Sequence, residues 1–97
     1  MISPTVGRKV WVFRVEGSFD IKQPEDGTVI YVHDDHTVNI EGFSALGHPF
    51  TILGCHLVQD DEPKPEGRDF AAWMPYQKGQ AAKTEQLEKT IAEGVKL

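Results

Sequence analysis

The clearest structural signal in the chain is the segment Thr28-Val-Ile-Tyr-Val-His-Asp-Asp-His-Thr-Val-Asn-Ile-Glu-Gly-Phe43. Its two outer runs are rich in β-branched and aromatic side chains, which favour extended strands. In the second run, valine and isoleucine alternate with asparagine and glutamate, so one face is apolar. Asp34-Asp35 lies between the runs, and aspartate favours turns because its side chain bonds to the nearby backbone. The segment therefore predicts a hairpin of two strands, at residues 28–33 and 37–43.

Further strands are predicted on either side of this hairpin. Residues 8–15 lack glycine and proline and combine Val, Trp and Phe, and residues 50–58 form another apolar run. Short strands spaced by about 8–12 residues are typical of a small barrel or sandwich. About 60 residues are too few for an immunoglobulin-type sandwich. The predicted fold is mainly β: a small SH3-like, partly open barrel of four to five antiparallel strands, followed by one C-terminal α-helix.

The chain is predicted to form a single domain with three parts. Residues 1–60 form the barrel, residues 61–72 an acidic proline-containing linker, and residues 73–97 an aromatic junction and the C-terminal helix. The helix is expected from Gln77 to Ala92, where good helix formers dominate. A narrow apolar stripe on it either docks on the barrel or meets its copy in another subunit, and its members are Thr84, Leu87, Ile91 and Val95.

Composition excludes several classes of protein. The 97 residues carry a net charge of −5, which weakens any case for direct nucleic-acid binding. No apolar run approaches the roughly 20 residues that span a bilayer, and the first residues are not expected to form a signal peptide. The single cysteine, Cys55, lies in an apolar run and is expected to be a reduced, buried residue. A cytosolic protein without membrane contact is therefore expected.

Catalytic and metal-binding patterns find little support. The cluster His33-Asp34-Asp35-His36 offers metal-ligand types, but it falls where the hairpin turns, and a solvated turn is the favoured interpretation. Cys55 and His56 are adjacent in a strand and point to opposite faces, so the imidazole cannot act as base for the thiol. We therefore predict no enzyme activity, no metal and no cofactor.

Aromatic and basic residues are the better candidates for ligand contact. Aromatic rings offer stacking faces, and guanidinium or ammonium groups pair with phosphate. The alternative is that Trp11 belongs to the core and that Trp73 and Tyr76 hold the helix to the barrel. The predicted ligand-binding residues are Trp11, Arg14, Arg68, Trp73, Tyr76 and Lys78.

Three segments resemble a family of small uncharacterised proteins of tailed bacteriophages and prophages. They are residues 1–8, residues 28–40 with 57–61, and the tail that begins Trp73-Met-Pro-Tyr-Gln77, which is the most specific of them. The resemblance implies a viral origin, a small β-rich fold and action in the cytoplasm of the bacterial host. It supplies no catalytic residues.

Two functions fit such a protein. The first is a soluble counter-defence protein, acting as a homo-oligomer, that blocks a host immune factor or sequesters a nucleotide-derived immune signal between subunits. The second is a virion or assembly protein, such as a head or tail adaptor, with the helix as a docking arm. An adaptor is expected to carry extended arms, whereas this chain has one short linker, so the soluble binding protein is favoured.

Overall fold

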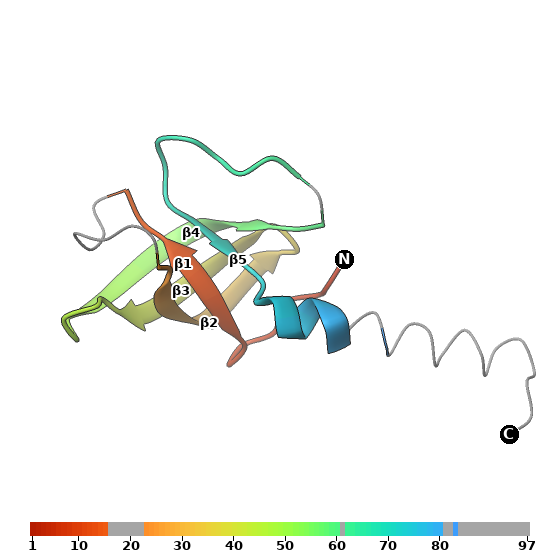
Figure 1. Cartoon of the computed structure of the whole chain (residues 1–97), viewed down its shortest axis with the longest axis horizontal. Helices are drawn as coiled ribbons and strands as arrows, with labels where there is room; N and C mark the ends of the chain where they lie inside the picture. Colours follow the sequence, from red (N-terminus) through yellow and green to blue (C-terminus); the bar gives the residue numbers. More distant parts are fainter. Residues whose placement is uncertain (16–22, 61, 81–82, 84–97) are drawn as a thin grey trace, which may run out of the picture.

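The computed structural model describes residues 1–15, 23–60, 62–80 and 83. Within them, five β-strands form one closed barrel (Figure 1). A short helix follows at residues 75–80, and residue 83 is also helical. The predicted mainly β, SH3-like barrel with a C-terminal helix is thereby confirmed. The strands are β1 (Lys9–Phe13), β2 (Glu25–Asp34), β3 (Thr37–Phe43), β4 (Pro49–Val58) and β5 (Phe70–Ala72).

Strand β5 closes the barrel. The first four strands form an antiparallel meander, and β5 pairs antiparallel with β1 and parallel with β4. The sequence predicted a partly open, all-antiparallel ring and assigned residues 61–72 to a linker, and both predictions need correction at this strand. Three residues, Phe-Ala-Ala, carry no alternation of their own, so their strand conformation depends on pairing with β1 and β4.

The core lies inside this ring. Along β1, Val10 and Val12 are fully buried while Trp11 between them is only partly so, as expected for a strand with one face on the core. The predicted inward pair Val38 and Ile40 is fully buried as well. The core cluster consists of Val10, Val12, Val29, Val38, Ile40, Cys55, Leu57, Ala71 and Trp73.

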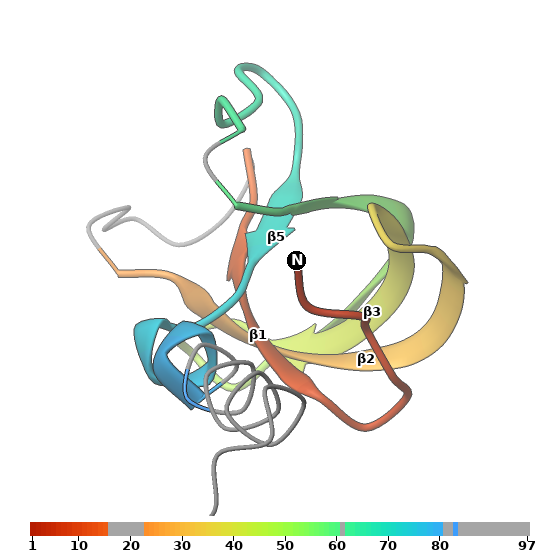
Figure 2. The same cartoon turned by 90° about the vertical axis from the view of Figure 1, so that its right-hand side faces the viewer.

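Polar groups close the two ends of the barrel. Strand β4 begins near Phe50 and ends just before Gln59, so these two residues mark opposite ends. At the Gln59 end, the N-terminal segment crosses the mouth of the ring (Figure 2), and Ile2 bonds to the Gln59 side chain. At the Phe50 end, the guanidinium of Arg14 lies over the aromatic ring and pairs with Glu25.

The helix start explains the Trp73–Gln77 motif. Pro75 occupies the first helical position, where its missing N–H costs nothing. The Gln77 carboxamide accepts a hydrogen bond from the Met74 N–H at 2.9 Å, as in a capping box, and donates to the Lys9 carbonyl of β1 at 2.8 Å. The helix thus begins at Pro75, two residues before the predicted start. Gln77 bonds it to the barrel.

The predicted apolar stripe of the helix lies outside the described residues. In the part of the chain that is described, no helix combines the length and the apolar character that crossing a membrane requires.

Candidate functional site

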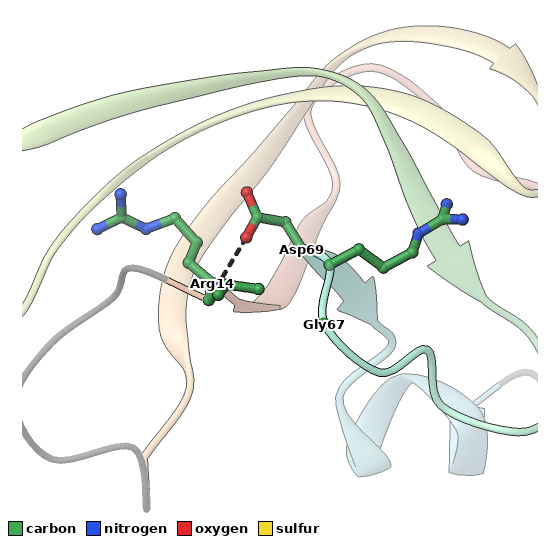
Figure 3. A pocket seen from close by; sticks show the side chains of 5 residues that line it. Arg14, Gly67 and Asp69 are labelled. Carbon is green, nitrogen blue, oxygen red and sulfur yellow. Dashed lines mark hydrogen bonds between the residues drawn. The ribbon is translucent and has the colours of Figure 1, made fainter.

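A pocket of about 330 Å³ opens between the end of β1 and the segment that leads into β5 (Figure 3). The two walls are more than 50 residues apart in sequence, and β1–β5 pairing brings them together. The Val15 N–H donates to Asp69 Oδ1 at 2.8 Å, which ties one wall to the other. The lining residues are Arg14, Val15, Gly67, Arg68 and Asp69.

Arg14 forms a fixed part of the wall. Its guanidinium makes two hydrogen bonds with Glu25, Nε to Oε1 and a terminal nitrogen to Oε2, both at 2.9 Å. The same group lies 4.1 Å from the centre of the Phe50 ring. The Arg14 side chain is 21% exposed and that of Glu25 only 6%. Figure 3 shows the Arg14 guanidinium directed away from the Asp69 carboxylate. Its charge is therefore largely neutralised within the protein.

Arg68 is the cationic group that a ligand can engage. Its side chain is exposed and makes no hydrogen bond or ion pair with another described residue. The preceding Gly67 has φ +70°, a conformation that favours glycine, and this turn presents Arg68 at the rim. A guanidinium in this setting can pair with an anionic group through two parallel N–H donors.

Of the six predicted ligand-binding residues, the structure brings Arg14 and Arg68 together. Trp11 is partly exposed and pairs with Ala72 across β1 and β5, away from the pocket lining. Trp73 is 2% exposed and its Nε1–H donates to Gln59 Oε1 at 3.1 Å, so its ring faces are occupied by the core. The other two, Tyr76 and Lys78, are exposed on the helix and do not line the pocket.

Sequence reasoning missed the groups next to the pocket. Phe13 and Phe70 stack with ring centres 4.8 Å apart, and the Lys64 ammonium lies 5.8 Å from the centre of the Phe13 ring. These rings flank the lining residues in sequence, since one precedes Arg14 and the other follows Asp69. Arg68 was the one residue of the predicted linker proposed as a ligand contact, so Lys64 and Phe70 were not considered as part of a site.

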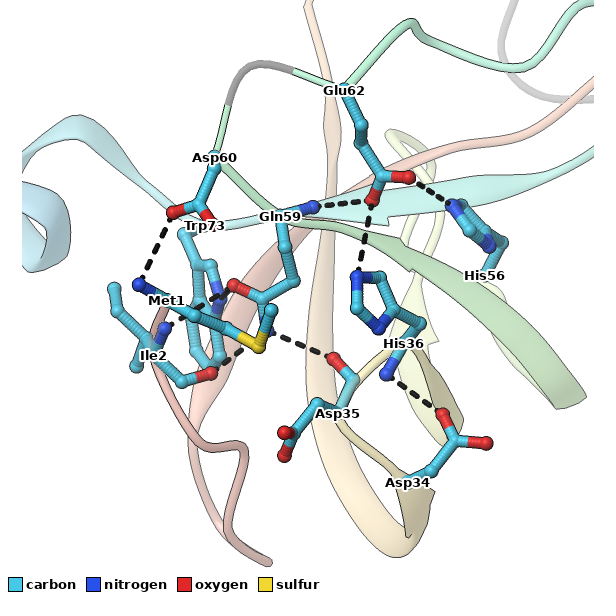
Figure 4. A network of polar contacts seen from close by, with 10 residues as sticks. All are labelled: Met1, Ile2, Asp34, Asp35, His36, His56, Gln59, Asp60, Glu62 and Trp73. Atoms are coloured by element: carbon cyan, nitrogen blue, oxygen red, sulfur yellow. Dashed lines mark hydrogen bonds and ion pairs between the residues drawn. The ribbon is translucent and has the colours of Figure 1, made fainter.

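A polar network occupies the other end of the barrel (Figure 4). Glu62 accepts a hydrogen bond from the Gln59 backbone N–H, and its second carboxylate oxygen lies 3.3 Å from His56 Nε2. His36 Nε2 lies 4.0 Å from the first oxygen. Among the described residues, no three His, Cys, Asp or Glu side chains are arranged to hold a metal ion. The network therefore fastens the loop after β4 to the β2–β3 turn.

The second half of the His33–His36 cluster forms the hairpin turn. The Asp34 carboxylate accepts the His36 backbone N–H at 2.8 Å, which is the local bond that aspartate makes in turns. His33 instead contacts the Asn39 side chain at 2.9 Å on the neighbouring strand. The turn consists of Asp35 and His36, one residue later than the predicted Asp34-Asp35, because β2 extends through Asp34.

Cys55 belongs to the core, as predicted. Its side chain is 2% exposed. Burial, with a smaller contribution from the charge of Asp69, raises the pKa of the Cys55 thiol to about 11. Because the thiolate is the nucleophilic form, this thiol is unreactive near neutral pH.

Acidification is expected to weaken the Glu62 contacts. The backbone N–H of Gln59 is the largest cause holding the Glu62 pKa below its usual value, and His56 adds to it. A lowered folded-state pKa means that the contribution to stability is present above the unfolded pKa, near 4.3, and is lost as pH falls through the folded pKa. The difference in free energy of unfolding between the wild type and Glu62→Gln should therefore narrow from pH 5 to pH 3, measured by urea denaturation.

Glu66→Gln is the control for this pH experiment, because Glu66 is an exposed carboxylate in the same loop. Its free-energy difference from the wild type should change less over the same pH range. A wild-type minus Glu62→Gln difference that is constant from pH 5 to pH 3 would show that Glu62 makes no pH-dependent contribution.

No protein-family model, curated protein or solved structure matches this chain. The resemblance to phage proteins therefore stays a prediction from residues 1–8, 28–40, 57–61 and the tail that begins at Trp73. The chemistry of the site depends on the pocket, whose lining combines an exposed guanidinium, a neutralised one and a carboxylate.

Proposed function

We propose that this protein is a phage-encoded, non-enzymatic binding protein that sequesters a nucleotide-derived immune signal in the cytoplasm of the infected bacterium. The observation that carries the proposal is the pocket between Arg14 and Arg68. Its volume of about 330 Å³ falls at the lower end of the range for small-molecule sites, which is about 300–1,000 Å³. Guanidinium groups bind phosphate oxygens strongly and with defined geometry.

The two arginines have different roles in this proposal. Arg14 is immobilised by Glu25 and Phe50 and shapes one wall. Arg68 supplies the hydrogen bonds to the anionic group of the ligand. Because the chain as a whole carries a net charge of −5, a phosphate is repelled at long range and needs this local cation. Arg68 therefore determines the affinity for the anionic part of the ligand.

A binding role, as opposed to a catalytic one, fits the composition of the lining. The pocket is lined by two arginines, a valine, a glycine and an aspartate, with no Ser, Cys, His or Lys side chain among the described lining residues. Of the usual nucleophiles and proton-transfer groups, the described lining therefore contains only the Asp69 carboxylate, without a second such side chain to act with it. Assembly into a homo-oligomer through the C-terminal helix belongs to the same proposal and is tested by the mass of the protein in solution.

Calorimetric titration against linear and cyclic nucleotides and ADP-ribose derivatives tests the proposal. In a parallel denaturation experiment, a ligand present at 100 times its dissociation constant should raise the free energy of unfolding by about 2.7 kcal/mol. Arg68→Ala should weaken binding about tenfold or more, because a hydrogen bond to a charged group contributes roughly 1.5–3 kcal/mol.

Arg8→Ala is the matched control, since Arg8 precedes the start of β1 and its side chain bonds, among the described residues, only to the nearby Thr5 hydroxyl. It should bind like the wild type. The proposal is overturned if no compound of the panel binds. Stoichiometric protein in purified phage particles would then support the virion or assembly role, and capture of a host immune protein would support direct blocking of that factor.

A further inference from the structure

Asp69 places a negative charge inside the same pocket. Its Oδ1 accepts the Val15 N–H at 2.8 Å, and the side chain is partly buried. No other hydrogen bond reaches the carboxylate from the described residues. An ionised carboxylate offers about four acceptor positions. Most of the acceptor capacity of Asp69 is thus left for a ligand.

A purely anionic ligand does not fit such a lining. Phosphate alone would satisfy Arg68 but would be repelled by Asp69 in the same pocket. A ligand that carries an anionic group and, separately, N–H donors satisfies both side chains. When the ligand binds, its N–H groups and the Asp69 carboxylate lose hydrogen bonds to water. They must therefore bond to each other, because an unpaired buried polar group costs free energy. The pocket therefore selects for two kinds of group on one molecule.

We infer that Asp69 sets the specificity of the site by accepting N–H groups from a nucleobase, and that the preferred ligand carries guanine. This inference rests on the proposed nucleotide-binding function. Guanine presents two adjacent donors, N1–H and the 2-amino group, which match the two oxygens of one carboxylate. Adenine has an acceptor at N1 and so offers only its amino group along that edge. Hypoxanthine has N1–H but lacks the 2-amino group.

Isothermal titration of the wild-type protein with GMP, AMP and IMP tests the inference without any substitution. The expected order of affinity is GMP, then IMP, then AMP, with about a tenfold difference between GMP and AMP, because a hydrogen bond to a charged group contributes at least about 1.5 kcal/mol. Equal affinity for the three nucleotides would overturn the inference and leave the proposed function standing. Absence of binding by these three nucleotides and by every compound of the wider panel would overturn both.

The Asp69→Asn variant tests whether Asp69 is the source of the preference for GMP. The asparagine oxygen can still accept the Val15 N–H, while the second oxygen becomes an NH₂ donor. The preference for GMP over AMP should disappear, and affinity for inorganic pyrophosphate should stay equal or increase, because a negative charge is removed. Glu66→Gln, an exposed acid-to-amide change in the same loop, should keep the preference. A preference for GMP that survives in Asp69→Asn would overturn the role of Asp69.

Discussion

Trp73→Ala is expected to lower the free energy of unfolding by about 4 kcal/mol, because large-to-alanine changes of a buried aromatic residue cost about 3–5 kcal/mol. Trp73 is 2% exposed and belongs to the core cluster. Its Nε1–H also donates to the buried Gln59 side chain at 3.1 Å. The truncation removes this bond and leaves a cavity in the core cluster. Urea denaturation followed by circular dichroism measures the change.

Tyr76→Ala provides the control for this prediction, since Tyr76 lies three residues later and is 66% exposed. Its free energy of unfolding should stay within about 0.5 kcal/mol of the wild-type value. The sequence had offered both residues as ligand-stacking candidates. An unchanged denaturation midpoint in Trp73→Ala, together with lost nucleotide binding, would show that the indole contacts ligand and is not a core residue.

The two tryptophans illustrate what the sequence could predict. Alternation along a strand assigns side chains to two faces, so residues 8–15 place Val10 and Val12 on one face and Trp11 on the other, as the structure has them. It did not say which face is inside, because both faces of residues 8–15 are largely apolar. Trp73 follows a three-residue strand that has no period of its own, so its burial depends on where β5 attaches.

The pocket could be predicted even less from the sequence, because it is formed by long-range contacts. Arg14 and Arg68 were proposed as ligand contacts from their chemistry, but no spacing rule predicts that they meet. Their approach follows from the pairing of Phe13 with Phe70, which was not predicted. Asp69 was missed for the same reason, since within an acidic linker it resembled any solvated carboxylate. Hairpins, in contrast, were predictable because their pairing is local.

Gln59 is the residue whose importance the sequence indicated least. It lies just after β4 and is 2% exposed. Its Oε1 accepts the Ile2 N–H at 3.3 Å and the Trp73 indole N–H at 3.1 Å. Its Nε2 donates to the carbonyls of Ile2 and Asp35, both at 2.8 Å. One carboxamide therefore connects the N-terminal segment, the β2–β3 turn and the residue after β5, as Figure 4 shows.

Gln59→Leu should lower the free energy of unfolding by about 3 kcal/mol, because each buried polar group left without its partner costs roughly 1–3 kcal/mol. Leucine has a similar size but no polar atom, so the Trp73 N–H in the core loses its acceptor. Gln23→Leu, at an exposed position, should change stability by less than about 0.5 kcal/mol.

A second measurement separates the loss of these bonds from a general loosening of the core. In Gln59→Leu, hydrogen exchange should accelerate first at the Ile2 amide, because Gln59 supplies its bond in the wild type. The amides of the β2–β3 ladder, held by backbone pairing, should keep most of their protection. Uniformly faster exchange throughout the barrel would contradict this local role. A stability change below about 1 kcal/mol would mean that water replaces the carboxamide at little cost.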